Sequence, residues 1–367
     1  MNGWMGNLLR VNLTTKTSSI ESSEKYFKYI GGKGMANRIM YDEVPVGTDP
    51  AAPENKIVFA VGPNTGSSAP CSGRITISSL SPFTKYNAIV DAHMGGDTAV
   101  RMKNCGFDAM IIEGASDVPV YIYVNDDKIE IRDASHVWGK TTSDTTAILT
   151  KETDPSSNVV SIGPAGEALL NLSCVMTGIG HCGGGGLGKV FGSKKLKAVV
   201  FNGTKGTEIA DPERVVELNK YVIGDLMGSN NNHVVPTVAQ SWAEYDNKST
   251  RWTGHPGMTW GAAEGGPIDT GESAPGQPTL IGYRCQKAVF DHGAIAEKYT
   301  VKMTGCAMCP IRCYGSVFIP QMEKATGVVG SHANTCGAQN GFNLSALMTK
   351  FNDVEEEGDG KLIGSVY

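Results

Sequence analysis

Short apolar runs, separated by turns rich in glycine and proline, occupy the first 205 positions of the chain. Alternating apolar and polar residues are typical of half-buried strands, and short continuous apolar runs are typical of buried ones. This pattern predicts strands at residues 8–13, 57–61, 75–78, 107–113, 120–124, 128–131, 159–162 and 198–201. It also predicts short helices at residues 35–40, 98–104 and 143–151.

Beyond residue 205 the apolar residues take a helical spacing. Asp211 is suited to cap a helix and Pro212 to occupy its first turn, and one apolar face continues to about Gly228. One or two further helical turns are predicted at residues 294–301. We therefore expect two domains of an α+β protein, a strand-rich one at 1–205 and a partial, mainly α-helical one at 206–367. The apolar residues at 362–367, which carry no helix-capping pattern, lead us to expect that the chain stops inside a domain.

Composition narrows the classes of partner. A net charge of −5 over 367 residues, without a basic block, gives no electrostatic basis for binding nucleic acid. No segment approaches the 18 apolar residues of a transmembrane helix, and the N-terminus has no signal-peptide pattern. The nine cysteines are an odd number, which favours a reducing compartment in an unexported chain. We expect a cytoplasmic protein that binds neither nucleic acid nor membrane.

Three cysteines, Cys306, Cys309 and Cys313, lie within eight residues. Such spacing allows one turn to bring several thiolates to one metal centre, as in Fe–S proteins. A structural zinc site requires a second pair of ligands, and none follows Cys313. We interpret the triplet as three ligands of a [4Fe–4S] cluster, with zinc, a disulfide or unmetallated thiols as alternatives. Cys336 is a candidate fourth ligand or a core thiol.

Glycine is concentrated in clusters. Seven of the eleven residues at 178–188 are glycine, and consecutive bare amides can form an anion-binding nest, although a flexible loop explains the same composition. The run Gly31-Gly32 before a predicted helix has a tight loop without a ligand as its alternative interpretation. The segment 178–188 fits neither the nicotinamide nor the P-loop fingerprint.

Two polar residues stand close to glycine in candidate ligand positions. Arg74 follows Gly73 at the entry of a strand, where it can contact a phosphate or carboxylate, or form a surface ion pair. His93 precedes Gly95 and Gly96, where it can face a ligand or serve as a structural hydrogen-bonding group.

Several of these segments together resemble the aldehyde:ferredoxin oxidoreductase family of tungsten enzymes, especially its less characterised bacterial branch. The resemblance covers essentially the whole chain. Its marks are residues 8–13, the run 62–66 with 68–70 and Arg74, Gly95-Gly96, residues 161–167, residues 192–198 and the cysteine triplet.

The resemblance implies a fold, a cofactor and site residues. The fold is an N-terminal mixed sheet domain that forms the base for a tungsten or molybdenum bis-pyranopterin, followed by helical domains. The implied pterin contacts are Arg74, His93, Gly95, Gly96, His181 and Gly183. The implied cluster ligands are Cys306, Cys309 and Cys313.

The sequence departs from the family pattern at three places. His93 stands where better-known members have asparagine, Gly180 stands where they have a cofactor-binding arginine, and residues 327–336 lack their substrate-facing glutamate. Family members also carry a further domain with the fourth cluster ligand, so we expect a truncated chain or a partner chain that completes the site.

The expected function is oxidation of an aldehyde or related carbonyl at the pterin-bound metal. Electrons would pass through the [4Fe–4S] cluster to ferredoxin or another Fe–S carrier. The alternatives are a catalytically silent Fe–S or pterin-binding module for electron transfer, and a zinc-stapled structural domain.

Overall fold

The structure is a computed structural model that describes residues 2–177, 182–222, 272–274, 277–278, 300–304, 306–309, 314–318 and 332–336. The chain divides into two compact units, Met1–Val216 and Glu217–Tyr367. Each unit is described by itself. The helix α6 (Pro212–Lys220) spans the boundary between them.

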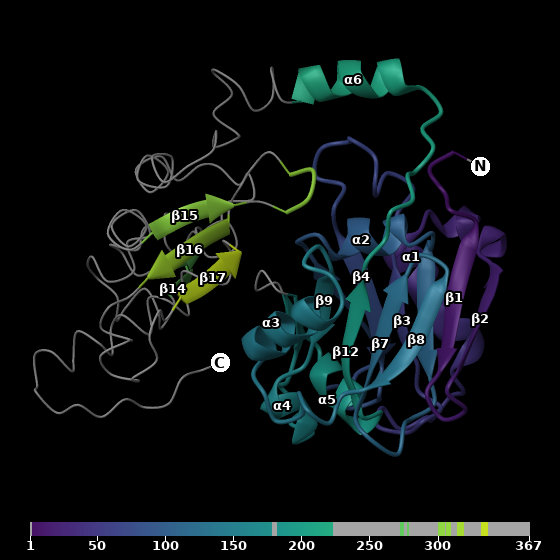
Figure 1. The fold of residues 1–367 in the computed structure, drawn as a ribbon, viewed down its shortest axis with the longest axis vertical. Coiled ribbons are helices and arrows are strands. Elements are labelled where there is room, and N and C mark those ends of the chain that lie inside the picture. Colours follow the sequence, from purple (N-terminus) through teal and green to yellow (C-terminus); the bar gives the residue numbers. More distant parts are fainter. Residues whose placement is uncertain are drawn as a thin grey trace, which may run out of the picture. The chain divides into compact units, whose positions relative to one another are not determined.

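The first unit begins with a six-stranded mixed sheet in the order β2-β1-β6-β3-β4-β5. Figure 1 labels four of these strands, β1 to β4. The pair β1–β6 is parallel and the other neighbouring pairs are antiparallel. Its elements are β1 (Asn7–Asn12), β2 (Thr17–Ser22), η1 (Glu24–Tyr29), α1 (Gly32–Glu43), β3 (Ile57–Ala60), β4 (Ile75–Leu80), β5 (Ile89–Met94), α2 (Thr98–Asn104) and β6 (Ala109–Glu113).

The second sheet repeats this plan in the order β8-β7-β12-β9-β10-β11. The pair β7–β12 is parallel, and the remaining neighbours are antiparallel, as in the first sheet. The unit is therefore built from two repeats with the same strand order. The second contains β7 (Val120–Asn125), β8 (Lys128–Asp133), α3 (Thr142–Glu152), β9 (Asn158–Ser161), α4 (Pro164–Glu167), β10 (Val175–Thr177), β11 (Cys182–Gly183), α5 (Leu187–Ser193) and β12 (Leu196–Phe201).

The two sheets share one hydrophobic core. Apolar side chains of both sheets form a single buried cluster, in which the Phe59 ring meets the rings of Phe191 and Phe201 edge to face at 6.3 and 6.1 Å between centroids. Helix α1 packs on the outer face of the first sheet through Met35, Ile39 and neighbouring residues. Helix α3 covers the outer face of the second sheet. The result is a helix–sheet–sheet–helix arrangement, which confirms the predicted α+β class with mixed sheets.

Local sequence explains how the elements begin and end. Thr141 accepts a hydrogen bond from the backbone N–H of Asp144 and so caps α3. The Gly31-Gly32 turn leads into α1. Glycine is required at Gly31 because a Cβ there would lie 2.4 Å from the carbonyl oxygen of Val61. The backbone of Val61 and Gly62 therefore leaves no room for a side chain at Gly31.

The described parts of the second unit contain the end of α6 and five short strands. These strands are β13 (Glu272–Ala274), β14 (Gln277–Pro278), β15 (Thr300–Thr304), β16 (Tyr314–Phe318) and β17 (His332–Cys336), and β15-β16-β17 form an antiparallel sheet. The helix predicted at 294–301 is wrong at Thr300 and Val301, which belong to the strand β15. Residues 294–299, and the predicted continuation of α6 from residue 223 to Gly228, lie outside the described residues.

Candidate functional site

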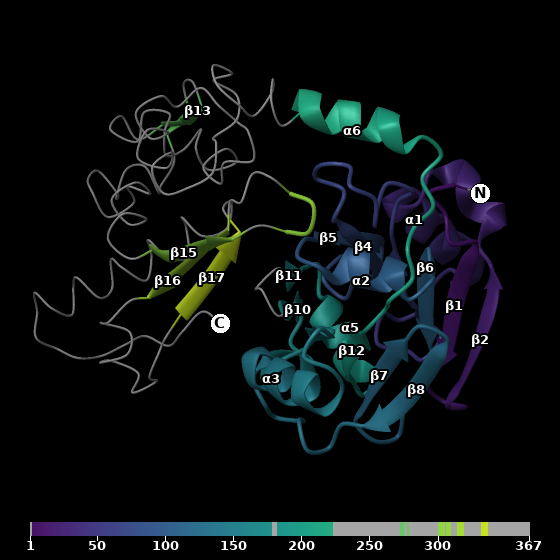
Figure 2. The ribbon, with the colours of Figure 1, turned by 45° about the horizontal axis from the view of Figure 1, so that its top comes forward.

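The edge strands of the two sheets meet at β5 and β11 (Figure 2). A Cβ added at Gly183 would lie 2.8 Å from Cγ2 of Val175 and 3.1 Å from Sδ of Met94. A Cβ at Gly185 would lie 2.5 Å from Cγ2 of Val90. Glycine at these positions therefore lets the backbone of the second repeat approach β5 of the first.

Each of these edge strands leads into a glycine turn and then a short helix. Gly95 and Gly96 follow β5, and both are buried. Gly184, Gly185 and Gly186 follow β11 at the equivalent place in the second repeat. Gly96 has φ +85°, Gly185 has φ +72° and Gly186 has φ +79°, a conformation that side chains disfavour. The duplicated fold thus presents two equivalent turns that carry no side chain.

Arg74 lies beside the first turn. The antiparallel β4–β5 register pairs Ile75 with Met94. Arg74, directly before β4, therefore lies beside Gly95, directly after β5. One guanidinium nitrogen of Arg74 donates to the backbone carbonyl of His93 at 3.1 Å, and the side chain is exposed. Its remaining donors suit a planar bidentate contact with an anion.

The imidazole of His93 is held by two neighbours. Its Nδ1 lies 3.0 Å from the Thr76 hydroxyl, and its Nε2 lies 2.8 Å from Oδ2 of Asp91. Thr76 is the cross-strand partner of His93 in the sheet. Both ring nitrogens are therefore engaged within the protein, and the structure places the imidazole as a hydrogen-bonding group on the sheet.

Asp91 connects this group to helix α1. The Nζ of Lys33 lies 3.0 Å from Oδ1 of Asp91, and Asn37 donates to the same oxygen at 3.4 Å. Burial raises the pKa of Asp91, but the hydrogen bonds from Lys33 and Asn37 outweigh it and leave the pKa below its usual value. Asp91, Lys33 and Asn37 were not predicted as site residues from the sequence. The two-residue spacing of Asp91 and His93 on one strand was the available signal, because such residues share a face.

The structure thus brings together five of the six predicted pterin contacts, namely Arg74, His93, Gly95, Gly96 and Gly183. His181 lies outside the described residues.

Two of the three predicted cluster ligands are described, in the second unit. The backbone N–H of Cys309 donates to the carbonyl of Cys306 at 3.0 Å, and Met308 between them has φ 54°. Both cysteines are half-buried, and Cys313 lies outside the described residues. Within the described ranges, no group of three or more His, Cys, Asp or Glu side chains forms a metal site.

The residues of the first unit fit a phosphate-bearing cofactor. Positive-φ glycines shape the turns after β5 and β11, Arg74 supplies a cation beside the first of them, and Asp91 directs its carboxylate to His93 and Lys33. The Thr177 hydroxyl, at the end of β10, is buried and has no hydrogen-bond partner in the described structure. The tight turn at Cys306–Cys309 has the soft thiolate donors that an Fe–S cluster requires.

Two lysines of the segment 192–198 have structural contacts. The buried Nζ of Lys194 donates to the carbonyls of Pro53 and Gly114 at 3.1 and 2.9 Å. The buried Nζ of Lys197 lies 2.5 Å from Oε1 of Glu167 and donates to the carbonyl of Lys140 at 2.8 Å. This basic segment therefore joins loops of the fold through its buried ammonium groups.

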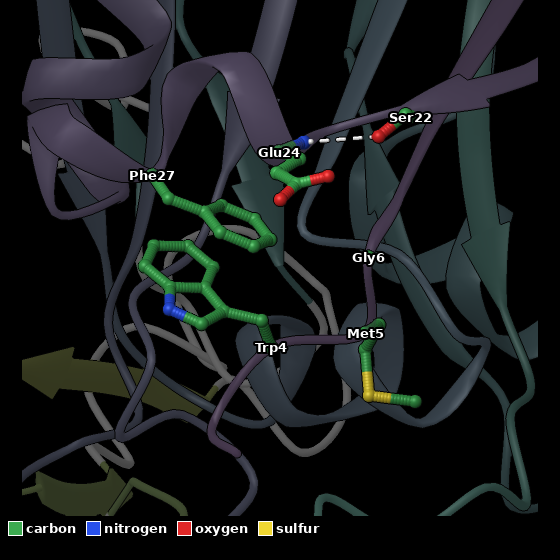
Figure 3. Close-up of a pocket in the computed structure, with 6 residues that line it drawn as sticks. All are labelled: Trp4, Met5, Gly6, Ser22, Glu24 and Phe27. Carbon is green, nitrogen blue, oxygen red and sulfur yellow. Dashed lines mark hydrogen bonds between the residues drawn. The ribbon is translucent and has the colours of Figure 1, made fainter. Parts of the chain in front are cut away.

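A separate cavity of about 210 Å³ lies beside the N-terminal segment (Figure 3). Its lining includes the rings of Trp4 and Phe27, which stack with centroids 4.2 Å apart. The N-terminal segment is fixed by Asp108, which accepts hydrogen bonds from the backbone N–H groups of Met5 and Gly6. None of the predicted pterin contacts lines this cavity.

Comparison with solved structures shows the same fold in a known complex. The chain is similar to a chain of the "Active site complex BamBC of Benzoyl Coenzyme A reductase in complex with 1,5 Dienoyl-CoA", with a TM-score of 0.69 and 25% sequence identity. The match covers 97% of this chain and 56% of that chain. The protein therefore shares its fold with a subunit of a redox active-site complex.

Sequence comparison gives the family. The family profile described as "Aldehyde ferredoxin oxidoreductase, N-terminal domain" matches residues 8–203. The chain is 35% identical to a protein named tungsten-containing aldehyde ferredoxin oxidoreductase from Pyrococcus horikoshii. It is 34% identical to the protein of the same name from Pyrococcus abyssi. Each match covers 97% of this chain and 56% of the relative, so the chain spans about half the length of these proteins. The chain belongs to the aldehyde ferredoxin oxidoreductase family.

No helix in the described ranges is both long and apolar enough to cross a membrane.

Proposed function

We propose that the chain is the cofactor-binding N-terminal part of an oxidoreductase that acts on an aldehyde or a related oxo compound. The first unit would hold a tungsten or molybdenum bis-pyranopterin. The segment Cys306–Cys313 would hold a [4Fe–4S] cluster that passes electrons to ferredoxin or another Fe–S protein. The cytoplasm of an anaerobe is the location that suits such low-potential carriers.

The contact between β5 and β11, with Arg74 and the Gly95-Gly96 turn at the end of β5, carries this proposal. The cofactor has phosphate-bearing groups, and the Gly95-Gly96 turn, which carries no side chain, lies next to Arg74. Family membership supports the same assignment.

The chain's own residues have distinct tasks in this proposal. Arg74 would neutralise phosphate charge, and the backbone at Gly95, Gly96 and Gly183 would hold the cofactor. When bound, the pterin metal supplies the two-electron redox chemistry and polarises the carbonyl of the substrate. Cys306, Cys309 and Cys313 bind the cluster, and their backbone turn brings N–H groups near the sulfurs.

The substrate is proposed only as a carbonyl-containing small molecule. Residues 327–336 contain no glutamate, so a substrate-facing carboxylate is absent from that stretch of sequence. This absence favours, as a second candidate, a catalytically silent Fe–S and pterin-binding module that transfers electrons. A partner chain that supplies further ligands is compatible with either function.

Metal and pterin analysis of the full chain, purified without oxygen, tests the proposal. Tungsten or molybdenum with pterin, iron and sulfide supports the oxidoreductase. Iron and sulfide without pterin support the electron-transfer module. Zinc alone would contradict both and indicate a structural metal domain.

A further inference from the structure

The imidazole nitrogens of His93 are not available to contact the proposed cofactor. Its Nδ1 is engaged by the Thr76 hydroxyl and its Nε2 by Asp91. The side chain lies on the face of β5 that it shares with Asp91, whereas Met94 lies on the opposite face, against the position of Gly183. Arg74 contacts the backbone of His93 and not its ring: the His93 carbonyl accepts a hydrogen bond from the Arg74 guanidinium at 3.1 Å.

We propose that Asp91 is a positioning residue of the phosphate-binding turn, acting through His93 on Arg74 and on the Gly95-Gly96 backbone. This inference rests on the proposed function, because it concerns the phosphate group of the proposed cofactor. Asp91 does not contact the ligand. It fixes the His93 ring, and the ring fixes the end of β5, from which the turn emerges.

The position of Asp91 is determined from two directions. Within the sheet, Ser78 is its cross-strand partner, and the Ser78 hydroxyl donates to Oδ1 of Asn37 at 2.8 Å. From helix α1, Lys33 and Asn37 both reach Oδ1 of Asp91. The carboxylate is therefore held on one oxygen by α1 and holds His93 with the other.

Helix α1 is itself tied to the same end of the sheet. The backbone N–H of Gly32 donates to the carbonyl of Val61 at 3.0 Å, directly after β3. A continuous set of contacts therefore runs from the start of α1 through Lys33, Asp91 and His93 to Arg74. Supporting hydrogen bonds of this kind set the orientation of groups that touch a ligand.

The test uses the full chain produced without tungsten or molybdenum and titrated with inorganic phosphate. Amide NMR signals of Gly95 and Gly96 report phosphate binding, and the ¹⁵N signals of the His93 ring report its hydrogen bonds. Asp91→Asn keeps the size of the side chain and removes the charge that holds the Nε2–H group. Asp42→Asn is the matched control, because Asp42 is a carboxylate on α1 paired with Arg38 and has no contact with His93.

We expect Asp91→Asn to weaken phosphate binding by about tenfold and to change the His93 ring signals, with the melting temperature lowered only slightly. Lys33→Met should weaken binding in the same direction by a smaller factor, and it serves if Asp91→Asn fails to fold. Asp42→Asn should bind phosphate as the wild type does.

Wild-type affinity in Asp91→Asn, accompanied by altered His93 ring signals, would overturn the positioning role and leave the proposed function standing. A wild-type chain whose Gly95 and Gly96 signals do not respond to phosphate would overturn the proposed function together with this inference.

Discussion

The ammonium of Lys197 and the carboxylate of Glu167 lie 2.5 Å apart in the interior of the first unit. The Lys197 side chain is fully buried and that of Glu167 is 7% exposed. The second carboxylate oxygen of Glu167 accepts the backbone N–H of Gly139 at 2.8 Å. Two separate sequence segments, 161–167 and 192–198, are therefore joined by one buried ion pair.

Removing one partner of this pair should destabilise the fold strongly. Glu167→Ala leaves the Lys197 ammonium buried without its counter-ion, so we expect the free energy of unfolding to fall by about 3 to 5 kcal/mol. Urea denaturation followed by circular dichroism measures the change. The double variant Glu167→Leu with Lys197→Met should recover much of the loss, because it replaces two charges with apolar groups.

An exposed pair provides the control. Glu130 pairs with Lys128 and Arg132 on the edge strand β8, where all three side chains are at least 31% exposed. Glu130→Ala should therefore cost under about 1 kcal/mol. Equal losses for Glu167→Ala and Glu130→Ala would refute a special role for the buried pair.

Lys194 should make stability depend on alkaline pH. Burial lowers the pKa of Lys194 to about 8 in the folded protein, from an ordinary value of 10.5. Between these values the unfolded chain binds the proton and the folded chain does not, so stability should rise with pH through this window. The gain over the whole window is about 3 kcal/mol.

Lys194→Met isolates this contribution. Denaturation of the wild type and the variant at a series of pH values from 7 to 11 gives the free energy of unfolding of each. The slopes of these two free energies against pH are then compared. The wild-type curve should rise relative to that of Lys194→Met as the pH passes 8. Parallel curves would show that the Lys194 ammonium is retained in the folded state throughout.

The contact between the two repeats should be sensitive to one methyl group. Gly183→Ala places a Cβ 3.1 Å from Sδ of Met94 in the first repeat and 2.8 Å from Cγ2 of Val175 in the second, so we expect a loss of about 1 to 3 kcal/mol and a displaced β11. Gly184→Ala adds the same methyl group where nothing lies within 4 Å, and it should cost under about 0.5 kcal/mol. Thermal unfolding of the two variants compares them directly, and equal melting temperatures would contradict the packing described for Gly183.

Iron content should depend on the cysteine triplet and not on other thiols. Cys309→Ser removes a proposed ligand, so the anaerobically purified variant should lose most of its iron and sulfide. Cys71→Ser, in the loop before Arg74, changes an exposed cysteine of the first unit and should retain them. Unchanged iron in Cys309→Ser would remove this residue from the ligand set.

The sequence predicted the strands of the first unit because their apolar patterns are set by burial on one or both faces. The strand β1 and the hairpin β7–β8 are examples, each confirmed within a residue or two of its ends. The strand β5 was missed because its residues are mostly half-exposed and carry Asp91 and His93 in an Ile-Val-Asp-Ala-His-Met run. The repeated strand order leaves no trace in sequence spacing, so the duplication emerged only from the sheet pairing.

The candidate site was predicted in its residue types but not in its contacts. Glycine clustering indicated Gly95, Gly96 and Gly183, since glycine marks close backbone approach. Sequence alone could not show that the His93 ring is engaged by Thr76 and Asp91, because that depends on strand register and on the position of α1. All the predicted pterin contacts and cluster ligands stay predictions, and two of them, Cys313 and His181, lie outside the described residues.

The tungsten and molybdenum content of the purified full chain, compared between wild type and Arg74→Met, tests the central claim most directly. Arg132→Met is the matched control, because Arg132 lies on β8 at the edge of the second sheet opposite β11. We predict metal and pterin in the wild type and in Arg132→Met, and about tenfold less in Arg74→Met with an unchanged melting temperature. Metal-free wild type, or equal metal content in Arg74→Met and wild type, would contradict a pterin site at the meeting of β5 and β11.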